Sequence, residues 1–418
     1  MKRKVCVVIT ARPSYSRIKT ALQAIQQVPE LELQLVVAAS ALLDRYGSVI
    51  DDIVADGFHV DASVHTVLEG SSPLTAAKTT GLGIIELSNV FGNLRPDVVV
   101  TVADRYETLA TAIAAAYMNI PLAHVQGGEI TGSIDEKVRH SITKLADLHL
   151  VSTARASEYV IRMGEAPETV FVTGCPSIDL AAEILSSPEL DFDPIERYGG
   201  VGAQLDLSGG YVVVLQHPVT TEHQLARAQI EETLAAVQSS GVPALWFWPN
   251  VDSGSDGTST GIRAFRERER NAPIHFFKNM HPPDFLRLLY GSRGIVGNSS
   301  VAIRECSFLG TPAVNIGSRQ TGRERGANVI DVGYTRSEIV RAMAQHRDRP
   351  SPTRTKLYGD GRAGQRIATA LATATLRCEK RLSYYTEEAD RPHATPADGA
   401  PTGGETGPVA VPGEVLRQ

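Results

Sequence analysis

Residues 124–140 read HVQGGEITGSIDEKVRH and join two patterns of different period. The apolar run 121–125 predicts a short buried strand, and the amphipathic run 136–145 predicts a helix. The glycines between them allow a ligand to approach the backbone closely. Open α/β sheets bind ligands beyond the carboxyl ends of their strands. We therefore predict that this loop lies in a functional cleft.

Several side chains of this stretch can exchange protons or orient groups that do so. Asp135 and Glu129 are candidate proton-transfer groups, and His124 and Arg139 could orient them. The alternative is a helix cap at Ser133 or Asp135, with the other charges simply solvated.

Strand-like apolar runs alternate with helical segments along the chain, which predicts parallel sheets covered on both faces. Strands are expected at 5–10, 33–39, 97–102, 122–125, 148–152, 211–216, 244–248, 274–278, 294–296 and 313–316. Helices are expected at 15–28, 107–117, 136–145, 222–239, 283–290, 301–309, 337–346 and 364–380. The fold class is therefore α/β, with two Rossmann-like doubly wound domains facing a cleft.

The predicted division of the chain follows from its composition. Pro, Asp and Gly accumulate from 186 to 210, which indicates a linker between the two domains. The expected parts are an N-terminal domain (1–185), a C-terminal nucleotide-binding domain (186–365), a C-terminal helix (364–386) and a tail (387–418). Ile367, Leu371 and Leu376 are the expected contacts of that helix. The tail has few large apolar residues and is predicted to be disordered.

Composition bears on the possible partners. The net charge of −6 disfavours nucleic-acid and membrane partners. Four cysteines without CxxC spacing predict neither a zinc site nor disulfides and fit a reducing compartment. The apolar run near the N-terminus is too short for a membrane span and is expected to be a strand, not a signal peptide. The expected location is the cytoplasm.

The first turn from strand to helix, residues 10–16, reads TARPSYS and contains no glycine. A nicotinamide cofactor is therefore not expected, because its fold uses G-x-G-x-x-G at this turn. Arg12 and two serines at a helix start instead predict an anion site. The alternative is that Arg12 only covers a sheet edge.

Two further strand ends carry candidate groups. Asp104 and Arg105 follow the strand expected at 97–102 and can place a carboxylate and a guanidinium in the same cleft. The alternative is that Asp104 caps a helix, and both interpretations can hold together. His217 follows the strand expected at 211–216. It could bind phosphate or act in acid–base chemistry, or be a structural histidine held by the backbone.

Residues 294–305 read GIVGNSSVAIRE, a pattern of strand, tight turn and helix. Ser299 and Ser300 lie at the helix start, where free N–H groups and the helix dipole favour an anion. Glu305 could accept hydrogen bonds from a ribose diol, and Arg319 could reach the same phosphates. Capping would explain the serines alone, so the combination predicts a nucleotide diphosphate site.

Together these motifs make the chain similar to the UDP-N-acetylglucosamine 2-epimerases, specifically the hydrolysing branch that forms N-acetylmannosamine. The resemblance runs from about residue 4 to about 370 and is carried by 12–16 (RPSYS), 104–105 (DR), 127–135 (GGEITGSID), 139–140 (RH), 216–221 (QHPVTT), 248–250 (WPN), 297–300 (GNSS), 304–305 (RE), 317–320 (GSRQ) and 358–361 (YGDG).

The resemblance implies a glycosyltransferase-B-like fold, often dimeric, that closes over UDP-N-acetylglucosamine. It implies that UDP is surrounded by Arg12, Ser16, Arg105, His217, Asn250, Ser299, Ser300, Glu305 and Arg319. Gln126 and Arg139 are further substrate-binding candidates. Asp104 and Asp135 are the implied catalytic acids, with Glu129 and His217 as further candidates.

The chain departs from this family at two places. Gln126 stands where members commonly have a catalytic glutamate, and Val-Ala precedes Asp104 where His-Gly is usual. Glutamine cannot exchange a proton as a carboxylate does. The acid–base roles therefore fall on Asp104, Asp135 and Glu129, or the second half-reaction differs.

The expected reaction begins with loss of UDP, which makes the proton on C2 of the sugar easier to remove and gives 2-acetamidoglucal. Water addition then yields N-acetylmannosamine, with neither cofactor nor metal expected. Three alternatives remain open. They are an epimerase that releases UDP-N-acetylmannosamine, a UDP-sugar glycosyltransferase of the same fold, and a non-enzymatic sugar-nucleotide sensor.

Overall fold

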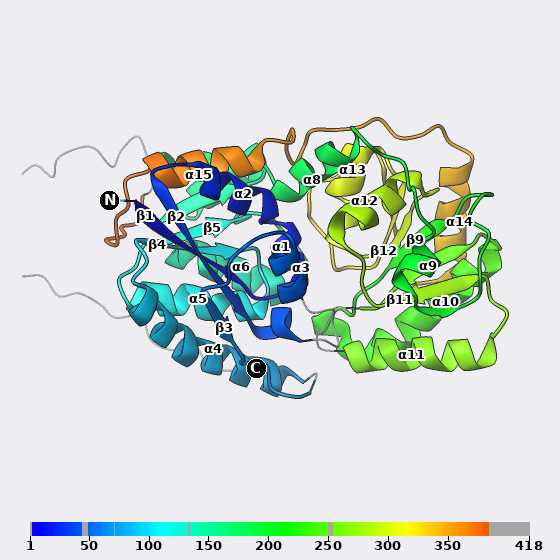
Figure 1. The fold of residues 1–418 in the computed structure, drawn as a ribbon. Helices are drawn as coiled ribbons and strands as arrows, with labels where there is room; N and C mark the ends of the chain where they lie inside the picture. Colours follow the sequence, from blue (N-terminus) through cyan, green and yellow to red (C-terminus); the bar gives the residue numbers. More distant parts are fainter. Residues whose placement is uncertain (1, 44–48, 71, 133, 250–253, 384–418) are drawn as a thin grey trace, which may run out of the picture. The chain divides into compact units, whose positions relative to one another are not determined.

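The protein is described by a computed structural model that covers residues 2–43, 49–70, 72–132, 134–249 and 254–383. Two seven-stranded sheets, each flanked by helices, account for these residues (Figure 1). The predicted α/β class with two Rossmann-like sheets is confirmed. The predicted tail lies outside the described residues.

The first sheet has the strand order β3-β2-β1-β4-β5-β6-β7, and all its strand pairs are parallel. Its strands are β1 (Arg3–Ile9), β2 (Leu31–Ala38), β3 (Ala62–Val64), β4 (Val98–Val102), β5 (Leu122–Val125), β6 (Leu148–Val151) and β7 (Val170–Val172). Every residue of β4, β5 and β6 is buried, as expected for parallel strands covered on both faces.

The second sheet has the order β14-β13-β12-β9-β10-β11-β8. Its strands are β8 (Val201–Gly202), β9 (Val212–Leu215), β10 (Ala244–Phe247), β11 (Ile274–Phe277), β12 (Ile295–Gly297), β13 (Ala313–Ile316) and β14 (Val329–Val332). Only the β8–β11 pair is antiparallel among the described strands of this sheet. The carboxyl ends of the six parallel strands therefore lie along one edge.

The described helices are α1 (Arg12–Ser16), α2 (Lys19–Gln27), α3 (Val49–Ala55), α4 (Pro73–Leu94), α5 (Tyr106–Tyr117), α6 (Ile134–Leu145), α7 (Ala154–Arg162), α8 (Pro176–Ile184), α9 (Pro194–Tyr198), α10 (Ala226–Ser240), α11 (Ser255–Arg268), α12 (Pro282–Gly291), α13 (Glu305–Leu309), α14 (Arg336–Arg347) and α15 (Ala363–Thr373). The predicted helices are present with shifted boundaries, whereas α3, α4, α7, α8, α9 and α11 were not predicted. The predicted helix 15–28 is wrong as one element, because Ile18 has a non-helical φ of −134° and separates α1 from α2. The predicted helix 364–380 ends earlier, at Thr373.

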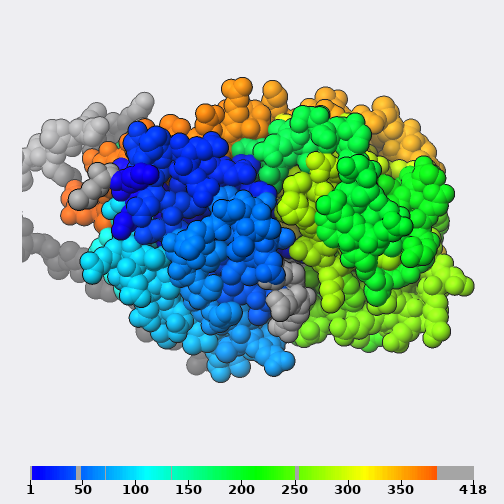
Figure 2. All heavy atoms as spheres, in the orientation of Figure 1, coloured from blue at the N-terminus to red at the C-terminus, as the bar shows by residue number. Residues whose placement is uncertain are grey.

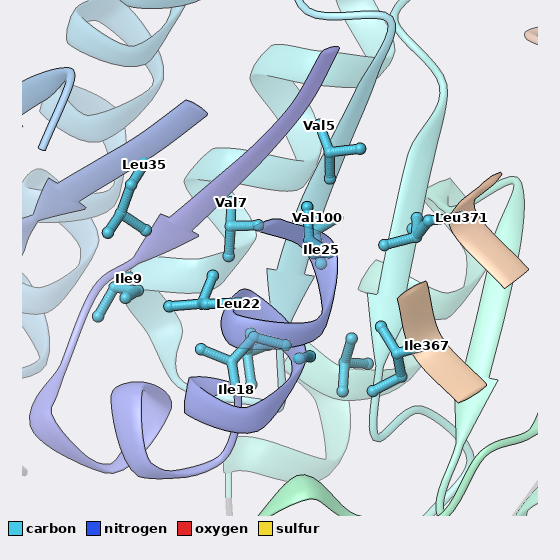
Figure 3. Packing of buried hydrophobic residues seen from close by; sticks show 14 of the residues in the cluster. Val5, Val7, Ile9, Ile18, Leu22, Ile25, Leu35, Val100, Ile367 and Leu371 are labelled. Carbon is cyan, nitrogen blue, oxygen red and sulfur yellow. The ribbon is translucent and has the colours of Figure 1, made fainter. Parts of the chain in front are cut away.

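Alternate residues of each strand pack against different helices, and this arrangement produces the core. On one face of the first sheet, Val5 and Val7 pack with Ile18 and Leu22 (Figure 3). On the other face, Cys6 and Val8 belong to a separate cluster with α4, α5 and α6. Full burial of each large aliphatic side chain contributes roughly 1.5–3 kcal/mol.

Helix α15 packs against α2 on the first sheet, although it follows the second sheet in the sequence. Ile367 and Leu371 are buried in the same cluster as Val5 (Figure 3). Leu376, beyond the end of α15, packs against this cluster, so the three predicted contacts are confirmed. The orange C-terminal segment accordingly adjoins the blue N-terminal residues (Figure 2). Conversely, Leu180 and Ile184 of α8 pack with the second sheet. The predicted domain boundaries stay a prediction.

Candidate active site

One cavity of about 140 Å³ is lined by residues from both sheets and their loops. The first half of the chain, which carries the first sheet, contributes α1, the residue after it and part of α8. The second half, which carries the second sheet, contributes strand ends, the loops that follow them and part of α12. Seven of the residues predicted from the sequence line it, namely Arg12, Ser16, His217, Ser299, Ser300, Glu305 and Arg319. The structure thus brings together side chains that lie up to about 300 residues apart in the sequence.

The cavity has a cationic lining. Arg12, Arg17 and Arg319 are its arginines, and Glu305 is the only carboxylate among the described lining residues. Burial, and next the neighbouring Arg304 and Arg323, lower the pKa of Arg17 to about 9. The guanidinium therefore stays charged at neutral pH. An anion in the cavity would relieve this repulsion between buried cations.

Arg12 is oriented by the second half of the chain. Its Nη1 donates to the carbonyl of Lys278 (3.2 Å) and to Oδ1 of Asn279 (2.7 Å). Burial lowers the pKa of Arg12 to about 10, so this side chain also remains a cation. Apolar side chains complete the lining, including Leu215, Phe247 and Phe285, and such surfaces suit a flat aromatic ligand group.

The loops after β9 and β12 are fastened to each other. The His217 N–H donates to Oδ1 of Asn298 (2.7 Å), and Nδ2 of Asn298 donates to the His217 carbonyl (2.8 Å). Gly297 has a φ of +140°, and a Cβ there would lie 2.1 Å from the Leu215 carbonyl oxygen. Only glycine permits this approach of the two strand ends, which holds His217 beside the cavity.

The turn that follows Asn298 presents polar groups to the cavity. Ser300 Oγ accepts a hydrogen bond from Nη2 of Arg17 (2.8 Å), and Ser299 caps the short 3₁₀ helix η5 (Ser300–Ala302). Glu305 Oε2 is buried and has no hydrogen-bond partner within the described part of the chain. A buried acceptor of this kind requires a donor, and a bound ligand could supply it.

The two predicted catalytic acids reach the cavity through its arginines. Asp104, just beyond β4, forms an ion pair with Arg139 and lies 3.9 Å from Nη1 of Arg17. Asp135, in the first turn of α6, lies 3.7 Å from Nη2 of Arg319. Arg17 and Arg319 both line the cavity. Two strand-end loops of the first half therefore place carboxylates next to its cationic lining.

Glu129 is more deeply enclosed and is not among the lining residues. Its Oε2 lies 3.6 Å from Nη2 of Arg304 and 3.2 Å from Nη2 of Arg323. Burial alone would raise the pKa of Glu129, but these two arginines and Arg17 outweigh it and lower the pKa. Glu129 is thus held as a buried carboxylate within an arginine cluster.

Both polar atoms of the Gln126 side-chain amide form hydrogen bonds within the protein. Its Oε1 accepts from Nη1 of Arg304 (2.6 Å), and its Nε2 donates to Sγ of Cys175 (2.9 Å). Arg139 is likewise occupied, because its Nη1 donates to the carbonyl of Glu129 (2.7 Å) and its guanidinium also pairs with Asp104. Both side chains are buried and hold other site residues in place.

Arg105 is not among the residues that line the cationic cavity. It donates to both carboxylate oxygens of Glu107, at 3.2 and 3.1 Å, and lines a separate cavity of about 1010 Å³. Arg12 lines both cavities. The predicted Asn250 lies outside the described residues.

Several residues of the site were not predicted from the sequence. Arg17 could have been found, because it lies in the same helical start as Arg12 and Ser16. Arg304 lies in a motif that was recognised, but its bond to Gln126 spans 178 residues and was not predicted. Arg323 and Cys175 carry no local signal, since their contacts with Glu129 and Gln126 join segments far apart in the sequence.

Within the described residues, no group of three or more His, Cys, Asp or Glu side chains is placed to hold a metal ion. None of the helices in the ranges that the structure describes is long and apolar enough to cross a membrane.

Fold and cavity together define a two-sheet α/β protein of the glycosyltransferase-B-like type with an arginine-lined cavity at its strand ends. The family model for UDP-N-acetylglucosamine 2-epimerase matches residues 23–372, and the chain belongs to this family. The predicted family and enzyme class are confirmed.

Named relatives cover most of the chain. A UDP-N,N'-diacetylbacillosamine 2-epimerase (hydrolyzing) of Legionella pneumophila is 32% identical over 379 residues, which are 91% of this chain and 98% of the relative. A GDP/UDP-N,N'-diacetylbacillosamine 2-epimerase (hydrolyzing) of Campylobacter jejuni is 29% identical over 333 residues, 79% and 84% of the respective chains.

Solved structures confirm the fold. The UDP-GlcNAc 2-epimerase of Methanocaldococcus jannaschii, in complex with UDP-GlcNAc and UDP, has a TM-score of 0.74 at 17% identity and covers 89% of this chain and 100% of its own. The Neisseria meningitidis enzyme bound to UDP-GlcNAc has a TM-score of 0.71 at 18% identity, with the same coverage.

Proposed function

We propose that the protein hydrolyses a UDP-linked 2-acetamido sugar with inversion at C2, so that UDP-N-acetylglucosamine gives N-acetylmannosamine and UDP. One observation carries this proposal. Three arginines line the cavity, and two of them, Arg17 and Arg319, lie within ion-pair distance of carboxylates outside the lining. These carboxylates belong to Asp104 and Asp135. A leaving-group site and acid–base groups thus adjoin each other.

UDP would occupy the cationic cavity. The apolar side chains near Phe285 suit the uracil ring, and the unpartnered Oε2 of Glu305 suits the ribose hydroxyls. Arg12, His217 and the turn at Ser300 would contact the diphosphate. Fixed cations stabilise the charge that develops as a diphosphate leaves, and they do so without reorganising during the reaction.

The chemistry would proceed by elimination and then addition. The C1–O bond to UDP breaks with its electron pair going to UDP, and a carboxylate takes the proton from C2, which leaves a C1=C2 double bond. Water then adds its oxygen to C1, and a proton is delivered to C2 from the opposite face. The sugar is released as the 2-epimer, with no net oxidation.

Asp104 and Asp135 are the proposed proton-transfer groups of these two steps. Glu129 is enclosed by Arg304 and Arg323, and Gln126 has no proton to exchange and is bonded at both ends. These two residues would instead position the arginine cluster. The relatives named as hydrolyzing support free sugar as the product.

The decisive experiment incubates the purified protein with UDP-N-acetylglucosamine alone and, separately, with UDP-N,N'-diacetylbacillosamine, the sugar nucleotide in the Legionella relative's name. Mass spectrometry should detect UDP and the free 2-epimeric sugar from at least one of them. A UDP-linked epimer would indicate the non-hydrolysing reaction instead. No conversion of either, with tight UDP binding, would favour a glycosyltransferase or a sensor.

The family resemblance also leads us to propose a homodimer acting in the cytoplasm. Light scattering should then give about twice the chain mass of 44.9 kDa. A monomer that is fully active would contradict the proposed dimer.

A further inference from the structure

His124 is fully buried, and it lines neither the cationic cavity nor the larger cavity beside Arg105. It lies in β5, opposite Thr101 of β4. One ring nitrogen, Nε2, is 2.8 Å from the carbonyl oxygen of Ala103, and the other, Nδ1, is 3.2 Å from Oγ1 of Thr143. Its two contacts thus reach the loop that precedes Asp104 and the helix α6.

The first contact holds an unusual backbone. Ala103 has a φ of +66°, in the left-handed region that side chains other than glycine seldom adopt. Its N–H donates to the Val125 carbonyl (2.9 Å), and its carbonyl is held by His124. Both sides of this strained residue are therefore fixed by β5. Because the same peptide group leads directly to Asp104, it sets the direction in which that side chain leaves the strand.

The second contact continues to the partner of Asp104. Thr143 and Arg139 lie one turn apart in α6, and the Arg139 guanidinium pairs with the Asp104 carboxylate. His124 and α6 therefore connect the peptide that precedes Asp104 with the ion-pair partner of its carboxylate. A Cβ at Gly127 would lie 2.9 Å from His124 Nδ1, so the imidazole has little space to move.

The protonation state of the ring follows from its surroundings. Burial lowers the pKa of His124 to about 3, and the charges of His149, His140 and Lys380 act in the same direction, although the bond to Ala103 opposes them. A neutral imidazole has one N–H. Since a carbonyl can only accept, Nε2 carries the hydrogen, and Nδ1 accepts from the Thr143 hydroxyl.

We propose that His124 is a positioning residue for Asp104. Its Nε2–H fixes the left-handed Ala103 peptide, and its Nδ1, through Thr143, ties that peptide to the helix that carries Arg139. This role rests on the proposed function, in which Asp104 transfers a proton. His124 itself touches no reacting atom.

The test compares His124→Leu with His124→Gln. Leucine removes the donor, whereas the glutamine amide can place an N–H near the position of Nε2. A misplacement of about 1 Å at a catalytic group costs on the order of 100-fold. We expect this loss in kcat for His124→Leu, with KM and the Kd for UDP within about twofold of wild type, and recovery to within about tenfold in His124→Gln.

His149 provides the matched control. It is equally buried, lies opposite His124 in the neighbouring strand β6, and bonds to Glu165 (3.0 Å). His149→Gln should therefore lower stability while keeping kcat within about threefold of wild type. A normal kcat in His124→Leu would overturn the proposal, and so would a His124→Gln enzyme no better than His124→Leu.

Two further measurements keep the proposal testable if His124→Leu does not fold. Thr143→Val, nearly the same shape, should lower kcat about five- to tenfold without changing the Kd for UDP.

Long-range ¹H–¹⁵N NMR of the imidazoles, assigned with His124→Gln, should show a neutral Nε2–H tautomer from about pH 5 to 8. An Nδ1–H tautomer or an imidazolium would overturn it. The NMR result holds whether or not the wild type turns over either sugar nucleotide, so failure of the proposed function is detected separately.

Discussion

The strand ends of the two sheets carry different chemistry. Beyond the strands of the first sheet lie the carboxylates of Asp104 and Asp135, each paired with arginine. Beyond those of the second sheet lie His217, the serine turn at Ser300 and the unpartnered Glu305. We therefore propose a division of labour, in which the second half binds UDP together with Arg12 of α1, and the strand-end carboxylates of the first half transfer protons.

The backbone differs between the two sets of strand ends as well. After β4 and β5 the left-handed positions are occupied by Ala103 (φ +66°) and Gln126 (φ +68°). In the second sheet, the corresponding positive φ values belong to Gly297 and Gly317. Glycine adopts this region without strain, whereas residues with side chains do not. Among the described residues, five residues other than glycine have a positive φ, and one of them, Ala103, directly precedes the proposed proton-transfer group Asp104.

The largest effect on turnover is expected from the acids of the first half. Asp104→Asn should lower kcat by roughly 10³-fold, because an amide cannot accept the C2 proton, and Asp135→Asn should lower it by roughly 10²-fold or more. The Kd for UDP, measured by calorimetry, should change little in both variants. Weaker UDP binding with a normal kcat would contradict the assignment of these two acids to proton transfer.

Arg17 connects the two sets of groups, because it donates a hydrogen bond to Ser300 and lies near the carboxylate of Asp104. Arg17→Met should lower kcat/KM by about 10- to 100-fold, the cost of removing a charge-assisted hydrogen bond. Both kcat and the Kd for UDP should deteriorate. A change in only one of these two constants would show that Arg17 acts either in proton transfer or in UDP binding, but not in both.

The binding groups of the second half should have smaller effects. Ser300→Ala and Glu305→Gln should each weaken UDP binding about 5- to 10-fold, as expected for one lost hydrogen bond, with kcat nearly unchanged. Equilibrium titration with UDP and steady-state kinetics measure the two quantities separately. A kcat that falls while the Kd for UDP is unaffected would contradict the assignment of these groups to binding.

The smallest effect on turnover is expected at Glu165, which lies away from the cavity. Burial raises its pKa, but hydrogen bonds from His149, Lys144 and Lys380 outweigh this and lower the pKa to about 2. Glu165→Gln should reduce the free energy of unfolding by roughly 3 kcal/mol at neutral pH, because it removes a buried carboxylate whose pKa folding lowers from about 4.3 to about 2. Steady-state assays should find kcat and KM unchanged.

The pH dependence of that loss has a definite sign. A carboxylate with a lowered pKa stabilises the fold fully above its unfolded pKa of about 4.3, and this contribution disappears as the pH falls toward about 2. Denaturant titrations should therefore show the wild type and Glu165→Gln converging in acid. A difference that is constant over this range would contradict the assigned ion cluster.

Ten of the described strands were predictable because buried parallel strands are continuous apolar runs, whereas the strands at the sheet edges, β3, β7, β8 and β14, were missed. The run 122–125 is the strand β5 with the same bounds. Helix α4 was missed, because its 22 residues include three glycines and leave Leu74 and Ile85 exposed, so no single apolar face marks it.

For the site, sequence reasoning found the loops but not the pairings within them. Seven predicted residues line one cavity, since strand ends of a parallel sheet meet at one edge. The bond from Arg304 to Gln126 spans 178 residues, and no local pattern specifies such a contact. For the same reason, Glu129 could be predicted as an acid of the loop but not as the centre of an arginine cluster.

The most direct test of the account is to run the reaction in heavy water and examine the sugar product by NMR and mass spectrometry. Elimination of UDP followed by protonation of C2 from solvent predicts one deuterium at C2 of the N-acetylmannosamine formed. A product of inverted configuration that carries hydrogen from the substrate at C2 would contradict the proposed role of the carboxylates beside the cationic cavity.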